Sequence, residues 1–458
     1  TYRRRACLAI PFYFSAAMDR PDASGGIALR FFTFNMGLNS DLEIEPFLPG
    51  IAAPLPDGTP VDFCCVTIPE TRIRLSSAVQ SLERMTLANG TFKSVVGTNA
   101  RTMRGGNWLD KLATTLNANL KTIHACGPRF QSGTGLIGMF NDLEKRIVGI
   151  EAPNPKKSFI GFTFRPCPEI GCGVRFCFVG AHFPMQMLKT VIQCNELLYC
   201  DQTRLHAAKL CLATPLIRVL RSALRNDVED EDTIIFLQGD LNSRTLNTAD
   251  GPRDVLRELL SDAELQQHIC EEAAADDNEV PDGEWRELVL YASTAELPVT
   301  YKFRTKTPAA DTSGGFQIRV GDAIGATAST LLHWGIDIGK IGREPKLAQY
   351  PSCTDRVVYW ASNELYKRMT WKVEPVCNVL YHAGGSDHRP VVVEAVLEIA
   401  PVDRRTVAVS ERRSHANGQK RVSVQEGLKD VLGEIGLDAS LADDVEDMLG
   451  EIEVITNE

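Results

Sequence analysis

The chain has 458 residues, of which 44% are hydrophobic and 24% are charged, and its formal net charge is -10. These proportions are typical of globular proteins and exclude wholesale disorder, collagen and a coiled-coil rod. No uncharged apolar run reaches the ~18 residues that a membrane span needs. Because the net charge is negative, the composition permits a soluble enzyme and disfavours a protein that coats nucleic acid.

Short β-rich runs alternate with helical stretches through most of the chain. Strands are predicted over Ala28–Phe34, Val61–Thr67, Phe159–Phe164, Val174–Gly180, Thr233–Gln238, Arg356–Tyr359 and Pro390–Leu397. A helix is predicted over Gln193–Arg225, where leucines fall among charged residues without a glycine. Residues 261–284 are expected to form a helix and a solvated loop, and residues 305–345 a Gly-, Ala- and Thr-rich loop.

Composition divides the chain into four parts. Residues 1–26 are interpreted as a linker or an initial strand rather than a signal peptide. Residues 27–400 form one α/β domain, because strands and helices intermix throughout. Residues 401–422 are a polar linker, and residues 423–458 form an acidic, amphipathic helical tail that either docks on the domain, the favoured interpretation, or binds a protein partner. The 13 Cys lack regular spacing, which indicates free buried thiols in a reducing compartment.

Polar residues follow several of the predicted strands. Asn35 and Glu70 end two of them, and Glu70 suits a hard cation such as magnesium. The string Gly239-Asp240-Leu241-Asn242-Ser243-Arg244 ends a third strand; its Asp can act as a base, its Asn can donate to a phosphoryl oxygen and its Arg can pair with a phosphate. Alone, this string is equally consistent with a turn closed by an Asx side chain.

A second loop, Ser386-Asp387-His388-Arg389-Pro390, precedes the last predicted strand. His388 can donate to an anionic transition state if a carboxylate raises its basicity. Asp355, in the string Pro351-Ser352-Cys353-Thr354-Asp355-Arg356-Val357, is a candidate for that carboxylate.

Together and in this order, the strings resemble the endonuclease/exonuclease/phosphatase superfamily and, within it, the inositol polyphosphate 5-phosphatases. The string at 239–244 resembles the family's GDLNYR, residues 298–303 resemble PPTYKF, residues 351–357 resemble PAWCDRIL, residues 386–391 match SDHRPV and residues 176–183 resemble CFVNSHL. The resemblance covers about residues 27–397. It implies a four-layer α-β-β-α sandwich of two mixed β-sheets, the DNase I-like fold.

The resemblance also implies roles for individual residues. Magnesium would be bound by Glu70, Asn35 and Asp387. The catalytic residues would be Asp240 as the base for the attacking water, Asn242 to orient water or phosphate, His388 paired with Asp355 as a donor to the phosphoryl oxygens, and His182 as a further phosphate contact. The substrate's other phosphates would be bound by Tyr301, Lys302, Arg244, Lys157 and Arg356. No phosphoenzyme is expected.

The departures from the family pattern lie where the substrate would be recognised. Ser243 replaces the usual Tyr, Cys353 replaces the usual Trp, and the loop at 156–158 differs from the family's NKG. The positions implied for metal and catalysis are retained, so the departures put substrate preference in question rather than hydrolysis.

The resemblance predicts a magnesium-dependent phosphatase that removes the 5-phosphate of phosphoinositide lipids or soluble inositol polyphosphates. Such an enzyme would be cytoplasmic and would reach membranes by peripheral contact, with no nucleic-acid partner. Two alternatives remain open: a nuclease or sphingomyelinase-type phosphodiesterase of the same superfamily, or a catalytically silent scaffold that binds phosphoinositides. The TYKF string and the acidic charge disfavour a nuclease.

Overall fold

The computed structural model describes the chain in segments. These are residues 26–35, 37, 53–59, 61–72, 82–86, 93–97, 122–126, 132–140, 144–151, 159–165, 173–184, 201–224, 232–274, 280–301, 352–380, 386–401, 427–430 and 453–456. The predicted N-terminal segment, the loop at 305–345 and almost all of the linker lie outside the described residues. Among the described helices, none has the length and apolar character to cross a membrane.

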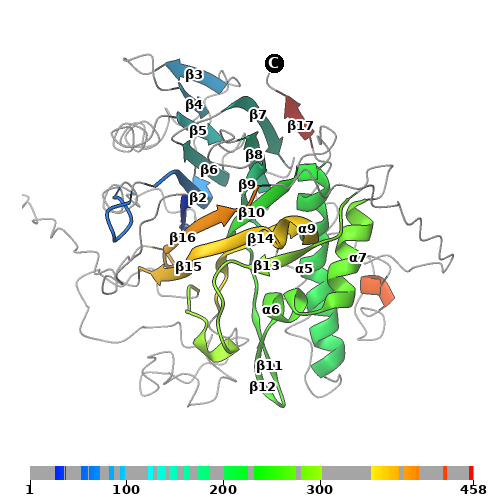
Figure 1. Ribbon diagram of the computed structural model, residues 1–458. Coiled ribbons are helices and arrows are strands. Elements are labelled where there is room, and N and C mark those ends of the chain that lie inside the picture. Colours follow the sequence, from blue (N-terminus) through cyan, green and yellow to red (C-terminus); the bar gives the residue numbers. More distant parts are fainter. Residues whose placement is uncertain are drawn as a thin grey trace, which may run out of the picture.

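Two large β-sheets form the centre of the molecule (Figure 1). The eight-stranded sheet has the order β15-β16-β1-β2-β6-β5-β4-β3, and its strands are β1 (Ile27–Thr33), β2 (Phe63–Arg72), β3 (Leu82–Thr86), β4 (Lys93–Gly97), β5 (Thr122–Cys126), β6 (Ser132–Phe140), β15 (Met369–Val379) and β16 (Val391–Ile399). The seven-stranded sheet has the order β13-β14-β10-β9-β8-β7-β17, and its strands are β7 (Glu144–Glu151), β8 (Phe159–Arg165), β9 (Arg175–His182), β10 (Thr233–Asp240), β13 (Gly283–Glu287), β14 (Asp355–Ser362) and β17 (Glu453–Thr456).

Both sheets are mixed. In the first, β1 runs parallel to β2 and antiparallel to β16; in the second, β10 runs parallel to β9 and antiparallel to β14. A small hairpin of β11 (Thr245–Thr248) and β12 (Gly251–Asp254) follows β10. The prediction of two mixed sheets is therefore confirmed.

The two sheets pack face to face through aromatic side chains. Phe31 and Phe63 from the first sheet meet Phe176, Phe178 and Phe236 from the second in one buried cluster. The ring centroids of Phe31 and Phe236 are 5.2 Å apart, and those of Phe63 and Phe176 are 5.7 Å apart. Because alternate residues of a strand face the same side, the two rings of β9, Phe176 and Phe178, come from positions two apart and leave the other face of that strand for a second layer.

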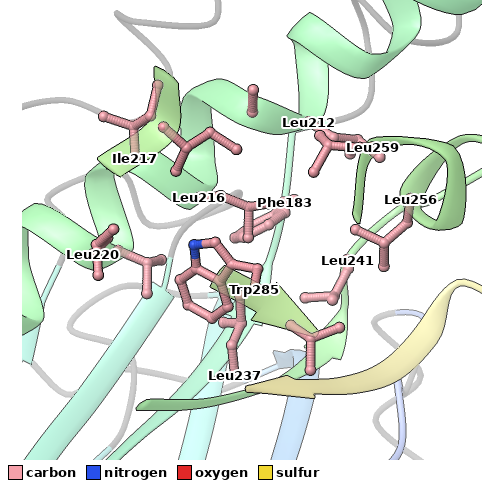
Figure 2. Close-up of a cluster of buried hydrophobic side chains, with 14 of the residues drawn as sticks. Phe183, Leu212, Leu216, Ile217, Leu220, Leu237, Leu241, Leu256, Leu259 and Trp285 are labelled. Carbon is pink, nitrogen blue, oxygen red and sulfur yellow. The ribbon is translucent and has the colours of Figure 1, made fainter. Parts of the chain in front are cut away.

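Helices cover the outer face of the seven-stranded sheet (Figure 1). They are α5 (Asp201–Leu224), α6 (Val255–Leu260) and α7 (Ala263–Ala273), and two short elements, the 3-10 helix η3 (Thr294–Glu296) and α9 (Asn363–Tyr366), lie in connections. Figure 2 shows the buried Trp285 of β13 between Leu216 and Leu220 of α5 and Leu237 of β10. The prediction of a helix at 193–225 agrees with α5 where the chain is described. The second helical layer that a four-layer sandwich would have, outside the eight-stranded sheet, stays a prediction.

Residues 261–284 are better integrated than a loop insertion. The expected helix is α7, but Leu265 and Ile269 are buried in the helical layer, and β13 begins at Gly283 and pairs with β14. Helix α7 packs in the cluster with α5 because its apolar residues recur at helical spacing on one face. The segment then leads into β13, which forms one edge of the seven-stranded sheet.

The acidic tail contacts the domain in two described places. Leu428 is 1% exposed and belongs to the buried cluster that α5 forms with the sheet. Residues 453–456 form β17, which pairs antiparallel with β7. The tail is predicted to be helical, but residues 453–456 form a strand. Without β17, β7 would be the edge strand and its outer backbone groups would lack this pairing.

Candidate active site

Along the inner faces of the strands, the aromatic core gives way to polar residues at one end of the strands. On β10, Phe236 faces the opposite sheet, and Asp240 follows on the same face at the end of the strand. On β9, Phe178 occupies the same core, and His182 ends the strand. Because Asp240 lies opposite His182 in the parallel register, the two side chains leave the sheet side by side.

Asp240 lies at the centre of the polar cluster and is 2% exposed. Its Oδ2 accepts a hydrogen bond from Asn35 Nδ2 at 2.8 Å, and its Oδ1 accepts one from the backbone N–H of Asn242 at 3.0 Å. His182 Nε2 lies 3.5 Å from Asp240 Oδ2 and 3.4 Å from Glu70 Oε1. The carboxylates of Asp240 and Glu70 therefore approach the same histidine nitrogen.

His388 forms the other side of the cluster. Its Nδ1 lies 2.7 Å from Asp355 Oδ2, and its Nε2 lies 3.6 Å from Asp240 Oδ2. Burial opposes a positive charge on the ring, but the negative charges of Asp355 and then Asp240 outweigh it and raise the pKa of His388 to about 9. His388 is therefore an imidazolium at neutral pH, and its Nδ1–H donates to Asp355 while its Nε2–H is on the side of Asp240.

Two threonine hydroxyls support Asp355. Thr354 Oγ1 donates to Asp355 Oδ2 at 3.0 Å, and Thr300 Oγ1 accepts the backbone N–H groups of Thr354 and Asp355 at 3.0 and 3.1 Å. Sequence reasoning did not single out either residue, although both lie inside the strings at 298–303 and 351–357. In the sequence, each threonine is simply a hydroxyl residue next to an implied site residue. Such neighbours are too common to predict a supporting role.

The backbone is left-handed at two residues of the cluster. Glu70 has φ 52° and Asn242 has φ 51°. Asn tolerates this region because its short side chain bonds locally, but Glu rarely adopts it. The β2–β6 register shifts between Ile68 and Thr71, so Glu70 lies in a bulge that re-aims its side chain. A strained, bulged carboxylate beside buried histidines is typical of a functional site.

Asn242, Arg244 and Tyr301 line the cluster beside His388. Asn242 Nδ2 donates to the carbonyl of Phe183 at 2.6 Å, and Arg244 Nη2 donates to Asn242 Oδ1 at 2.9 Å. The guanidinium carbon of Arg244 lies 4.1 Å from the centre of the Tyr301 ring, and that ring lies 4.6 Å from the His388 ring. The structure thus brings Arg244 and Tyr301 to the cluster and gives the Asn242 amide a role in holding Arg244.

Arg356 does not join the cluster, contrary to the role in substrate binding that the resemblance implies. Its Nη2 lies 2.6 Å from Asp254 Oδ2, its Nη1 pairs with Glu287, and its Nε donates to the carbonyl of Cys353 at 2.9 Å. Neighbouring residues of a strand face opposite sides, so Arg356 points away from the side that Asp355 presents to His388. The structure assigns Arg356 to a buried ion-pair network behind the site.

The remaining predicted site residues divide between described and undescribed segments. Asp387 is half-buried beside His388. It lies so close to Gly37, whose φ is +58°, that a side-chain Cβ added at Gly37 would be 3.3 Å from Asp387 Oδ1. The loops that carry Asn35 and His388 therefore approach closely, and Ser386 Oγ donates to the carbonyl of Asn35 at 2.6 Å. Lys157 and Lys302 lie outside the described residues.

The cluster offers oxygen ligands for a hard metal ion, but not through all of its members. Asp240, Asp355 and His388 lie close enough together to hold a metal ion. Magnesium, however, prefers oxygen ligands, and Asp355 is already hydrogen bonded to His388. Glu70, 27% exposed at its side chain and facing His182 beside Asp240, offers the more suitable oxygen atoms.

The chain matches no protein-family model and no curated protein. Among solved structures it is similar to a mutant Cimex nitrophorin in a ferrous NO complex, with 15% identity, coverage of 82% of this chain and 99% of that chain, and a TM-score of 0.40. It is also similar to truncated Caenorhabditis elegans TDP2, with 14% identity, coverage of 81% and 98%, and a TM-score of 0.33. A third is an endonuclease/exonuclease/phosphatase family protein from Bacteroides thetaiotaomicron, with 10% identity, coverage of 81% and 95%, and a TM-score of 0.33. Likenesses this low identify no activity.

Proposed function

We propose that the chain is a magnesium-dependent phosphoester hydrolase that removes the 5-phosphate from inositol phosphates, either as phosphoinositide lipids at a membrane surface or as soluble inositol polyphosphates. The observation that carries the proposal is the buried group of Asp240, His182, His388 and Asp355 with Glu70 at its edge. It combines a carboxylate that can accept a proton, a charged imidazole that can donate one, and an oxygen ligand for a cation.

The roles of the residues follow from their contacts. Asp240, with hydrogen-bond donors on both oxygens, is the base that takes the proton of an attacking water. His388, held and charged by Asp355, donates from Nε2 to the phosphoryl oxygens as negative charge develops. Magnesium bound by Glu70, Asn35 and Asp387 would neutralise charge on the scissile phosphate. No side chain of the group needs to form a covalent intermediate.

The substrate class is proposed from the groups beside His388. Arg244 is held by Asn242 and by the Tyr301 ring, so its guanidinium is oriented before a ligand binds. An oriented guanidinium suits a second phosphate on the same ring, because it can donate two parallel hydrogen bonds. Lys302 and Lys157, by resemblance, would add further positive charge.

The decisive experiment compares four substrates with magnesium and with chelator. These are phosphatidylinositol 4,5-bisphosphate in vesicles, the corresponding 3,4,5-trisphosphate, soluble inositol 1,4,5-trisphosphate and an abasic oligonucleotide. We expect magnesium-dependent phosphate release from at least one inositol substrate. In Asp240→Asn, release should fall by a factor of about 10² or more, because the base is lost.

The control is Asp430→Asn, which removes an exposed carboxylate of the tail and should leave release unchanged. Cleavage of the oligonucleotide without release from any inositol substrate would assign the cluster to a nuclease. Vesicle binding without turnover of any substrate would assign the chain to the scaffold class instead.

A further inference from the structure

A polar layer separates the aromatic core from the acidic cluster. The inward-facing row on β10 runs from Phe236 to Gln238 and then to Asp240, and Gln238 is fully buried. On β2 the corresponding row leads to Thr67, three residues before Glu70, and Thr67 is also fully buried. On β1 it leads to Thr33, which pairs with Thr67 in the parallel register.

One hydrogen bond in this layer crosses between the two sheets. Gln238 Nε2 donates to Thr67 Oγ1 at 2.6 Å. Gln238 belongs to the seven-stranded sheet and Thr67 to the eight-stranded sheet. Below this bond the sheets are held by packed rings, and above it β2 enters the bulge that carries Glu70. The bond therefore lies where close packing ends and the strained strand end begins.

The layer is poorly suited to a purely structural role. Gln238 Oε1 and Thr33 Oγ1 are buried, and neither has a hydrogen-bond partner among the described residues. A buried polar atom without a partner destabilises a fold, whereas replacing both members of a buried hydrogen-bonded pair by apolar groups of similar shape can be neutral or stabilising. An apolar pair at these two positions would continue the core.

We propose that Gln238 and Thr67 are positioning residues, whose bond between the sheets holds the Glu70 bulge in the position that magnesium binding requires. The inference rests on the proposed function, because it assigns Glu70 to the metal. Gln238 lies two residues before Asp240 on β10, and Thr67 lies three residues before Glu70 on β2. The hydrogen bond between the side chains of Gln238 and Thr67 therefore joins the two strands just before their site residues.

The test uses the full chain and the double variant Gln238→Leu/Thr67→Val. Its melting temperature without magnesium should equal or exceed that of the original chain, because two buried polar groups become apolar. Its magnesium affinity, measured by titration calorimetry and by the rise in melting temperature with added magnesium, should fall about tenfold, the lower end of the effect expected from second-layer groups.

Two matched variants isolate the bond. Thr33→Val makes the same change in the same layer but removes a hydroxyl that has no partner among the described residues, so magnesium affinity should not change. Thr67→Ser keeps a hydroxyl and should retain most of the affinity that Thr67→Val loses. Magnesium affinity in the double variant equal to that of the original chain would overturn the positioning role and leave the proposed hydrolase intact. An original chain that neither binds magnesium nor depends on it would overturn both.

Discussion

The protonation of His388 depends on two buried carboxylates. Burial alone would favour the neutral ring, and Asp355 is the strongest of the groups that oppose it, so the pKa of His388 rises to about 9. If His388 donates a proton or a charged hydrogen bond during turnover, kcat/KM should be constant near neutral pH and fall as the pH rises through about 9.

Replacing Asp355 should shift this descending limb. In Asp355→Asn the largest favourable charge is lost while burial remains, so the pKa of His388 falls and kcat/KM should decline at lower pH than in the original chain. The measurement is kcat/KM against pH for both proteins on one inositol phosphate. A descending limb at the same pH in both would mean that His388 is not the titrating group.

Gly239, just before the central carboxylate, combines two constraints. Its φ is +131°, and a Cβ there would lie 2.1 Å from the carbonyl oxygen of Ala181 on β9. Gly251 has φ +111° with nothing near its Cβ position. Gly251→Ala should therefore cost only the backbone strain, about 1–3 kcal/mol, and Gly239→Ala should lower the free energy of unfolding by more. Urea unfolding of both variants measures the difference, and equal losses would mean that contact with β9 is unimportant.

The residue types of the site could be predicted from sequence, but the directions in which their side chains point could not. Asn35, Asp240, His182, His388 and Asp355 lie together in the structure, and the roles that the resemblance implies for them stay predictions. Arg356 does not meet them, because the strand alternation that turns Asp355 inward turns the next residue outward. Its destination depends on carboxylates more than 60 residues earlier in the chain, at Asp254 and Glu287, which no local pattern connects to it.

At the scale of elements, strands with continuous apolar runs could be predicted and those with interruptions could not. β10 and β14 are buried along their whole length, and their apolar runs predict them. β15 was not, because it alternates half-buried with exposed residues and contains Pro375. The structure accommodates this proline within a register shift between Val373 and Val376, a feature that only the partner strand reveals.

Helix α7 begins with a cap whose strength depends on pH. Asp262 accepts the backbone N–H of Leu265 and pairs with Lys209 of α5. Burial opposes ionisation of Asp262, but these hydrogen bonds outweigh it and hold its pKa below the ordinary value of 3.8. Because the folded state lowers this pKa, the carboxylate stabilises the fold above pH 3.8 and loses that contribution as the pH falls through the folded value.

Two substitutions separate the cap from the ion pair. Asp262→Ala removes both and should cost about 0.5–2 kcal/mol through the cap alone. Asp262→Asn retains a good cap and should cost only the contribution of a partly exposed pair, about 0.2–1 kcal/mol. Denaturant unfolding at pH 7 and at pH 3 gives both values. The Asn variant should approach the original chain in stability at the lower pH, and a difference that grows there would contradict the assignment.

At the scale of the whole molecule, one described residue of the acidic tail, Leu428, is packed against the layer that carries α5. Leu428 is buried in that cluster, so Leu428→Ala should lower the free energy of unfolding by about 2–5 kcal/mol if the tail unfolds together with the domain. Asp430→Ala, at an exposed position two residues later, should change it by no more than about 0.5 kcal/mol. A separate early transition in Leu428→Ala would mean that the tail detaches while the domain stays folded.

The pairing of β1 with β16 has a consequence for how the domain can be rearranged. The strand that opens the domain lies beside the strand that closes it, with Ile27 opposite Leu397. Residues 27 and 397 thus lie at one place on the eight-stranded sheet. A short linker could join them in a circular permutant of residues 27–397 with new termini in a distant loop, at the loss of the contacts that Leu428 and β17 make.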